Sequence, residues 1–280
     1  MPARLANAPV SYGAFELTFA RSPDVPGPER VLEAIAAAGY SGTELGPPGY
    51  LGDADVLPAR LAAHGLALTG GYVPVRFGEP DEDLGGLEET LDLFDAAGGS
   101  PRAVLADDGE RRGPVDWSRL LDGVTRAADR VRERGYEPAF HHHMGTRVET
   151  CAEIERLLEG TDVPLLLDTG HLVAAGGDPV AALREWRDRI DYLHVKDADL
   201  GLLEAAPTWG DAWRGGVFCE LGAGDVDLHG FFRELGDYDG WLVVEQDWVP
   251  KPGEGAEDQI AAQGRNRRWL AEHAGLRIVS

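Results

Sequence analysis

The feature that most constrains the fold of this chain is a regular alternation of short apolar runs with longer amphipathic stretches along its 280 residues. Short apolar runs bounded by turn residues predict buried strands, and apolar residues recurring at three and four positions predict helices. The alternation predicts eight strands, at Leu5–Tyr12, Ser41–Gly46, Leu66–Pro74, Arg102–Ala106, Glu137–His143, Pro164–Thr169, Ile190–Lys196 and Trp241–Gln246. It also predicts eight helices, at Gly27–Ala38, Asp55–His64, Asp83–Ala97, Val115–Arg134, Glu149–Glu159, Asp178–Asp188, Asp227–Leu235 and Glu257–Ala274.

Strict alternation of strands and helices predicts parallel strands joined by right-handed crossovers. Eight such units predict a single α/β domain over residues 1–280, a closed (β/α)8 or TIM barrel, a fold that typically occupies ~250 residues. An open doubly wound sheet would carry a glycine-rich phosphate loop after its first strand, but the segment Tyr12–Glu16 contains no such motif. The longest irregular stretch, Ala198–Gly224, follows the seventh strand and is placed to cover the mouth of the barrel.

Charge and cysteine content exclude several kinds of partner. The chain has 26 Lys plus Arg against 49 Asp plus Glu, a net charge of −23, and no concentrated basic patch. A polyanion or an anionic membrane surface would repel such a chain, because both are bound mainly through cationic side chains. No apolar run approaches the ~20 residues of a membrane span, no secretory signal is visible, and Cys151 and Cys219 do not form a disulfide framework. We therefore expect a cytoplasmic protein with no nucleic-acid or membrane partner, and we leave a homo-oligomer open.

Ionisable residues gather where the predicted strands end, which is the end of a barrel that carries active sites. Polar residues also occur there simply because strands emerge into water. However, several unpaired carboxylates near a barrel axis would be costly and would repel one another unless a cation joined them. Histidine and carboxylate ligands from separate strands suit Mn²⁺, Co²⁺, Fe²⁺, Mg²⁺ or Zn²⁺. The ionisable residues at or just after these strand ends are Glu44, His141, His143, Asp168, His171, His194, Lys196 and Glu245.

The stretches FHHHMGTRVET, LLLDTGHLVAAGGDP, RIDYLHVKDAD, GVFCELGAG and GWLVVEQD resemble a known group of proteins. They are similar to the sugar phosphate isomerase/epimerase superfamily of xylose isomerase-like TIM barrels, and most of all to the inosose dehydratases (2-keto-myo-inositol dehydratases). The resemblance implies one divalent metal ion held by Glu, Asp, His and Glu from different strands. Asp168 matches the aspartate of the DTGH motif, His194 the histidine of HVKD, and Glu245 the glutamate of the last strand.

The first glutamate of that ligand set has no direct match. Many members of the superfamily place it at the end of the fifth strand, where this sequence has His141. Glu149 in the TRVET segment is our prediction for this ligand. Alternatively, His141 or His143, which share one strand face, ligate the metal or contact substrate, whereas His142 points to the opposite face.

Three further residues have two interpretations each. Lys196 is one of only two lysines in an arginine-rich chain, and an ammonium at this position can bind a substrate hydroxyl or stabilise an enolate. The alternative is a salt bridge to Asp197 or another acid. His171 contacts substrate or supports a metal ligand. Glu44 is a substrate contact or general base, or else pairs with a cation at the rim.

The resemblance implies an enediolate mechanism on a keto-sugar or keto-cyclitol, with Glu149 and Glu245 as the acid and base. We expect Lys196 as a further catalytic group, and Glu44, His141, His143 and His171 as substrate contacts. We expect dehydration, as in a lyase, with epimerisation or ketol isomerisation as the alternative. A non-catalytic sugar-binding relative and an abasic-site endonuclease-like protein are less favoured, the latter because of the charge of −23. Five aromatic residues near the rim are candidates for an apolar wall against a sugar ring: Tyr12, Phe15, Tyr50, Trp213 and Trp248.

Overall fold

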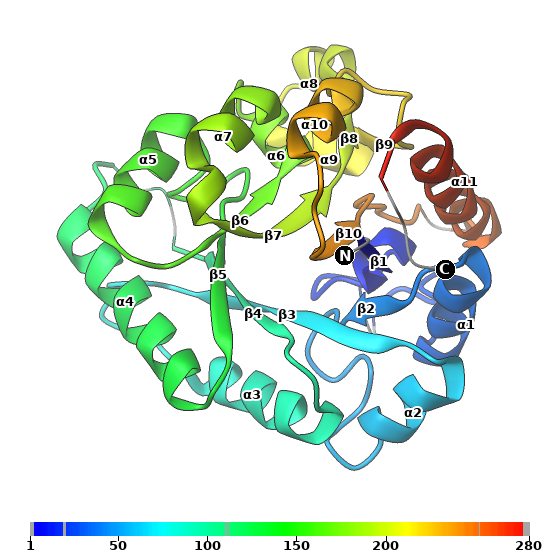
Figure 1. Ribbon diagram of the computed structural model, residues 1–280, viewed down its shortest axis with the longest axis horizontal. Helices are drawn as coiled ribbons and strands as arrows, with labels where there is room; N and C mark the ends of the chain where they lie inside the picture. Colours follow the sequence, from blue (N-terminus) through cyan, green and yellow to red (C-terminus); the bar gives the residue numbers. More distant parts are fainter. Residues whose placement is uncertain (1–2, 19–20, 110, 112, 252, 277–280) are drawn as a thin grey trace.

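The barrel predicted from the alternation is confirmed. The computed structural model describes residues 3–18, 21–109, 111, 113–251 and 253–276, in which eight parallel strands close in the order β1-β10-β7-β6-β5-β4-β3-β2 (Figure 1). The barrel strands are β1 Arg4–Asn7, β2 Gly42–Glu44, β3 Ala67–Val75, β4 Arg102–Asp107, β5 Glu137–His141, β6 Leu165–Asp168, β7 Ile190–Val195 and β10 Trp241–Val244.

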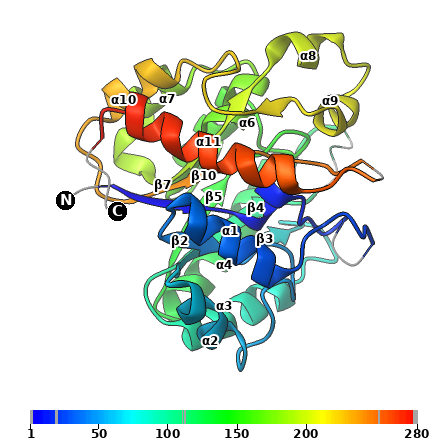
Figure 2. The ribbon, with the colours of Figure 1, turned by 90° about the vertical axis from the view of Figure 1, so that its right-hand side faces the viewer.

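All eight predicted helices are present and surround the barrel. They are α1 Pro28–Ala38, α2 Leu57–His64, α3 Gly85–Ala97, α4 Trp117–Glu133, α5 Cys151–Gly160, α7 Pro179–Trp186, α10 Leu228–Leu235 and α11 Glu257–His273. Helix α11 lies beside α1, so the last helix closes the ring against the first (Figure 2). Within the described residues, no helix combines the length and apolar character needed to cross a membrane.

Local sequence accounts for where several helices begin and end. The carboxylate of Asp116 accepts a hydrogen bond from the backbone N–H of Arg119 and so caps the start of α4. Gly39 and Gly65 follow α1 and α2 with φ of +90° and +65°, a left-handed conformation that costs glycine little. These signals lie in the sequence itself, which is why the helix positions were predictable.

The first predicted strand was too long. Strand β1 ends at Asn7, and Pro9–Tyr12 forms a 3-10 helix instead of continuing the strand. Pro9 fixes its own φ and lacks an N–H for the ladder, which favours the first position of a helical turn over a central strand. The chain therefore turns across the barrel end directly after β1.

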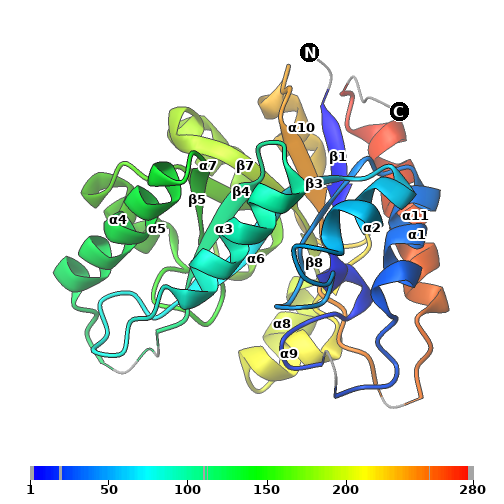
Figure 3. The same cartoon turned by 90° about the horizontal axis from the view of Figure 1, so that it is seen from below.

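The stretch Ala198–Gly224, predicted to be irregular, contains two short helices, α8 Leu200–Ala205 and α9 Trp209–Gly215. It also contributes to a small antiparallel pair of strands, β8 Asp197–Ala198 and β9 Phe218–Cys219. The buried Asp197 carboxylate accepts hydrogen bonds from the backbone N–H groups of Gly222, Gly224 and Val226. These bonds hold the end of the segment against its beginning. Helices α8 and α9 lie at the end of the barrel opposite the start of strand β1 (Figure 3).

The core has two layers. Between the barrel and its helices lies a large cluster of aliphatic and aromatic side chains, including the α4 stripe of Leu120, Val124, Ala127 and Val131. A smaller cluster fills the inside of the barrel, with Ala6, Val104, Ala139, Leu166, Tyr192 and Val243 among its members. This inner layer forms the apolar floor on which the polar groups of the next layer rest.

Candidate active site

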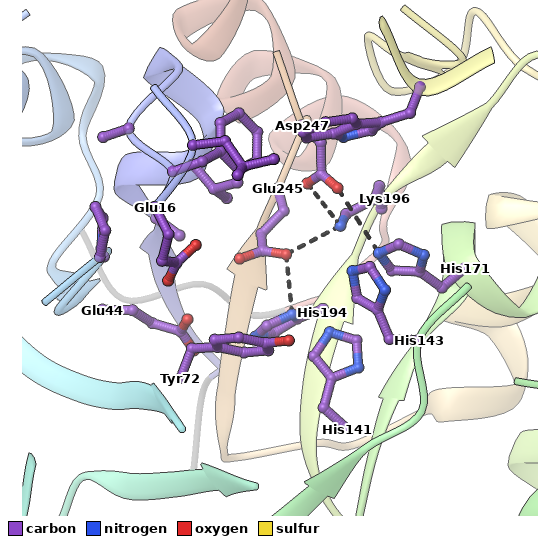
Figure 4. Close-up of a pocket in the computed structure, with 18 residues that line it drawn as sticks. Glu16, Glu44, Tyr72, His141, His143, His171, His194, Lys196, Glu245 and Asp247 are labelled. Atoms are coloured by element: carbon purple, nitrogen blue, oxygen red, sulfur yellow. Dashed lines mark hydrogen bonds and ion pairs between the residues drawn. The ribbon is translucent and has the colours of Figure 1, made fainter. Parts of the chain in front are cut away.

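The polar cluster follows from strand periodicity. Side chains two residues apart share one face of a strand. A residue two positions after a member of the apolar floor therefore also points into the barrel, one layer closer to the C-terminal end of the strand. Beyond Leu166, Tyr192 and Val243 of the floor, these positions are Asp168, His194 and Glu245. All three side chains are buried, and Figure 4 draws His194 and Glu245 pointing into one cavity.

Asp168, His194 and Glu245 converge with His141 at the centre of this end of the barrel. His194 Nδ1 lies 3.0 Å from Glu245 Oε2 and 3.7 Å from Asp168 Oδ2. His141 Nε2 lies 3.9 Å from Asp168 Oδ2. The structure thus brings three of the four predicted metal ligands together and adds His141, one of the alternatives for the remaining position.

The DTGH motif builds one side of this cluster residue by residue. Asp168 caps helix α6 (Thr169–Ala174) because its Oδ1 accepts a hydrogen bond from His171 N. Its Oδ2 is directed toward His141, His194 and Lys196. The Thr169 hydroxyl accepts from Lys196 N and donates to Lys196 O, so it fixes the neighbouring strand end. A Cβ at Gly170 would lie 2.8 Å from Lys196 Cγ, and glycine therefore makes room for the lysine stem.

Two atoms of the cluster are suited to bind a cation. Asp168 Oδ2 and His194 Nδ1 are buried and have no hydrogen-bond partner of proper geometry among the described residues, although charged neighbours lie within ion-pair distance. Buried polar atoms rarely stay unpaired, because each costs about 1–3 kcal/mol. Groups of histidine and carboxylate atoms with metal-ligand spacing occur here as His141, Asp168 and His194, and as Glu44, His194 and Glu245. The donor set suits a divalent ion of the Mn²⁺ to Zn²⁺ series.

Lys196 is buried against three carboxylates. Its Nζ lies 2.8 Å from Asp247 Oδ1, 3.1 Å from Glu245 Oε2 and 3.2 Å from Asp168 Oδ2. The salt bridge considered to Asp197 does not form, since that carboxylate binds backbone amides instead. Burial opposes the charge of Lys196, but the carboxylates of Asp168 and Asp247 outweigh it and raise the pKa of the ammonium. One ammonium leaves the surrounding acids with an excess of negative charge, which a divalent cation would offset.

Glu44 orients His194 from the other side. Its Oε1 lies 3.0 Å from His194 Nε2, so the two ring nitrogens face different carboxylates, Glu44 and Glu245. Burial opposes protonation of His194, but Glu245 and Glu44 raise the pKa of its imidazole well above the usual value. Burial also opposes ionisation of Glu245, yet His194 and Lys196 lower its pKa to about 2. A carboxylate on the far nitrogen of a ligating histidine is the usual device for fixing its tautomer and orientation.

His143 and His171 form a second wall of the cavity. Their rings lie 3.9 Å apart, and His171 Nε2 is 3.7 Å from Asp247 Oδ2. Burial lowers the pKa of His143 to about 4 and lowers that of His171 well below the usual value, so both rings are neutral. Neutral imidazoles at a cavity wall can accept or donate hydrogen bonds to hydroxyl groups. His142 does not line the cavity; its Nε2 accepts from Asp168 N.

Glu149 is not brought to this cluster. Its carboxylate accepts a hydrogen bond from Gly145 N at 2.7 Å and pairs with Arg111 at 3.2 Å, outside the residues that line the cavity. Glu149 precedes helix α5, whose capping box joins Thr150 to Glu153, and this helix start holds it at the rim. We therefore do not carry Glu149 forward as a ligand or a catalytic group.

The cavity measures about 220 Å³, and Figure 4 shows the cluster along its lower and right-hand sides. Of the five aromatic candidates, Phe15 and Trp213 line it and contact each other edge to face at 5.1 Å. Tyr12 and Tyr50 are buried in the core instead, and Trp248 packs near Gly13. An apolar wall is therefore present but smaller than predicted.

Sequence reasoning missed three polar residues of the cavity lining, namely Glu16, Tyr72 and Asp247. Asp247 could have been found, since it follows Glu245 by two positions and shares its face. Tyr72 lies within strand β3 and carried no motif. Glu16 lies in a loop, where no periodicity indicates direction.

Comparison with known proteins identifies the family to which this fold belongs. A family model described as the xylose isomerase-like TIM barrel matches residues 32–273. An inosose dehydratase from Geobacillus kaustophilus is 33% identical over 286 residues, covering 89% of this chain and 89% of that protein. Among solved structures, the IolI protein with a bound zinc atom superposes with a TM-score of 0.71 at 16% identity, covering 96% of this chain and 98% of the other. D-allulose 3-epimerase from Methylomonas sp. in complex with D-allulose gives a TM-score of 0.70 at 17% identity, covering 97% of each chain. The chain belongs to the xylose isomerase-like TIM barrel family, as the motifs at its strand ends predicted.

Proposed function

We propose that this protein is a sugar-modifying enzyme that uses one divalent metal ion, held by His141, Asp168, His194 and Glu245. The observation that carries the proposal is the pair of buried atoms Asp168 Oδ2 and His194 Nδ1, which have no hydrogen bond of proper geometry among the described residues and lie 3.7 Å apart beside Glu245. His141 takes the place that was predicted for Glu149. The zinc atom bound in the structure of the IolI protein, which has the same fold, supports a metal of this class.

The substrate class we propose is a keto-cyclitol or keto-sugar, and the reaction is removal of the proton next to the ketone by way of an enediolate. A divalent ion at such a site supplies a Lewis acid that stabilises negative charge on the ketone oxygen. Glu245 is ionised at neutral pH, because His194 and Lys196 lower its pKa, and this carboxylate is the group we assign to take the proton from carbon. Lys196 is charged and donates hydrogen bonds to substrate oxygens. His143 and His171 bind hydroxyl groups through neutral rings.

We favour dehydration as the outcome, because inosose dehydratases are among the relatives that match along most of this chain. Epimerisation or isomerisation is the second candidate, since the same site could return a proton to carbon, and an epimerase shares the fold. We place the enzyme in the cytoplasm, and because of its charge of −23 we expect neither nucleic acid nor an anionic membrane as a partner. A homo-oligomer stays a prediction.

The test is incubation of the Mn²⁺- or Co²⁺-loaded protein with a panel of keto-inositols and ketoses in D₂O, followed by NMR. Loss of water would identify a dehydratase, and deuterium at the α-carbon without water loss would identify an epimerase or isomerase. Absence of both changes with every ketone would contradict the proposal.

A further inference from the structure

We propose that Glu16 is a catalytic residue of the dehydration, the acid that protonates the hydroxyl group as it leaves. The inference rests on the proposed function and assigns a residue to the step that separates a dehydratase from an epimerase. Glu16 lines the cavity from the loop after β1, whereas the proposed ligands lie on other strands of the barrel.

Glu16 enters the cavity from the wall that faces the cluster. In Figure 4 its carboxylate points inward from the side of Glu44, whereas Lys196, His143 and His171 lie on the other side. A substrate in the cavity would therefore lie between the two groups. This arrangement suits an elimination in which one group takes a proton from carbon and a second group gives a proton to the departing oxygen.

The loop that carries Glu16 is held in place. The Thr18 hydroxyl accepts a hydrogen bond from Phe15 N and donates to backbone oxygens of Gly13 and Phe15. The ring of Phe15 also contacts Trp213 edge to face at 5.1 Å, which ties the loop to helix α9. These contacts on both sides hold the backbone of the loop from which Glu16 extends into the cavity.

The surroundings of Glu16 favour its acid form. Its neighbours along this wall are largely apolar and include Ala14, Phe15 and Leu17. Among the described residues it forms no ion pair, in contrast to Glu245, which is paired with Lys196. Desolvation by these neighbours raises the pKa of Glu16, with Asp108 adding to the effect, although the side chain is exposed at the mouth of the free protein.

The elimination of water needs no reactant other than the substrate and solvent. The base on the cluster side takes the α-proton, and the electrons of that C–H bond form the carbon–carbon double bond. The C–O bond of the β-hydroxyl breaks, and the Glu16 carboxyl transfers its proton so that the leaving group is water. Glu16 is then a carboxylate at the open mouth, where solvent returns its proton, while the base releases its proton to solvent.

The experiment compares the metal-loaded wild-type protein with Glu16→Gln, which keeps the size of the side chain but cannot donate a carboxyl proton. In D₂O, NMR gives two rates on one keto-cyclitol, α-deuteration and water loss. We expect water loss to fall about 10²-fold or more, the usual contribution of a general acid, while α-deuteration persists. Glu16→Asp should recover part of the rate of water loss, and Glu33→Gln, at an exposed position of helix α1, should match the wild type.

A substrate analogue with fluoride in place of the β-hydroxyl provides the second readout. Fluoride leaves without a proton, so Glu16→Gln should release it at nearly the wild-type rate. Equal losses of α-deuteration, water loss and fluoride release would show a structural role and overturn the inference, as would undiminished water loss. If the wild type exchanges the α-proton but loses no water, this inference alone is overturned. If the wild type shows neither exchange nor water loss, the proposed function is overturned as well.

Discussion

Replacing Glu44 by Gln should weaken metal binding although Glu44 is outside the proposed ligand set. Its Oε1 lies 3.0 Å from His194 Nε2 in a buried site, and the opposite ring nitrogen faces Asp168 and Glu245. Loss of such a partner typically reduces metal affinity by about 10- to 100-fold, equal to ~1.4–2.7 kcal/mol. Glutamine keeps an acceptor oxygen but removes the charge, so we expect about 10-fold for Glu44→Gln and about 100-fold for Glu44→Ala.

The assay is competition for Mn²⁺ or Zn²⁺ between the metal-free protein and a chromophoric chelator at fixed pH and salt. Glu16→Gln is the matched control, since it removes a carboxylate from the same cavity without touching His194. We expect this control to stay within about threefold of the wild type, because a charge without direct contact is screened. Equal affinities for Glu44→Gln and Glu16→Gln would refute the view that Glu44 acts through its bond to the histidine.

Three further predictions concern activity and stability. Glu245→Gln should abolish turnover while circular dichroism and thermal unfolding stay close to wild type; an active variant would exclude Glu245 from the chemistry. Arg147→Met should lower the free energy of unfolding by about 3–5 kcal/mol, because it strands the buried Asp107 carboxylate, and a loss below about 1 kcal/mol in denaturant titration would contradict this. Burial opposes ionisation of Glu153, but its bonds to Arg111 and to backbone N–H groups lower its pKa to about 2 from 4.5. Its charge therefore stabilises the fold above pH 4.5, by about 1 kcal/mol after solvent screening, and this contribution is lost as the pH falls toward 2. Glu153→Gln should thus be less stable than wild type at pH 7 and equal to it near pH 2; a difference that does not change with pH would count against the assignment.

The barrel was predictable because each unit carries its own signal. Helix α4 has its apolar stripe and its Asp116 cap, and glycines mark the ends of α1 and α2. The first strand was overextended because apolar content alone does not record the missing N–H of Pro9. The short helices α8 and α9 were not predicted, since neither has a buried stripe long enough to give a period.

The site was predictable where it lies on strands and unpredictable where it lies on loops. Asp168, His194 and Glu245 follow apolar runs at strand ends, so periodicity and motif both pointed to one cavity. Glu149 was chosen because its residue type matched the expected ligand, but its direction depends on Gly145 and Arg111, contacts that sequence does not reveal. Glu16 likewise depends on the turn held by Thr18.

The central claim is that one metal ion at His141, Asp168, His194 and Glu245 supports proton removal from a keto-sugar or keto-cyclitol. The most direct measurement adds Mn²⁺ in steps to metal-free protein in D₂O and follows 2-keto-myo-inositol and other keto-substrates by NMR. We predict that α-deuterated or dehydrated product forms at a rate that rises to one equivalent of Mn²⁺ per chain and then levels off. Full activity in the metal-free protein, or no product with any substrate at any Mn²⁺ concentration, would contradict the account.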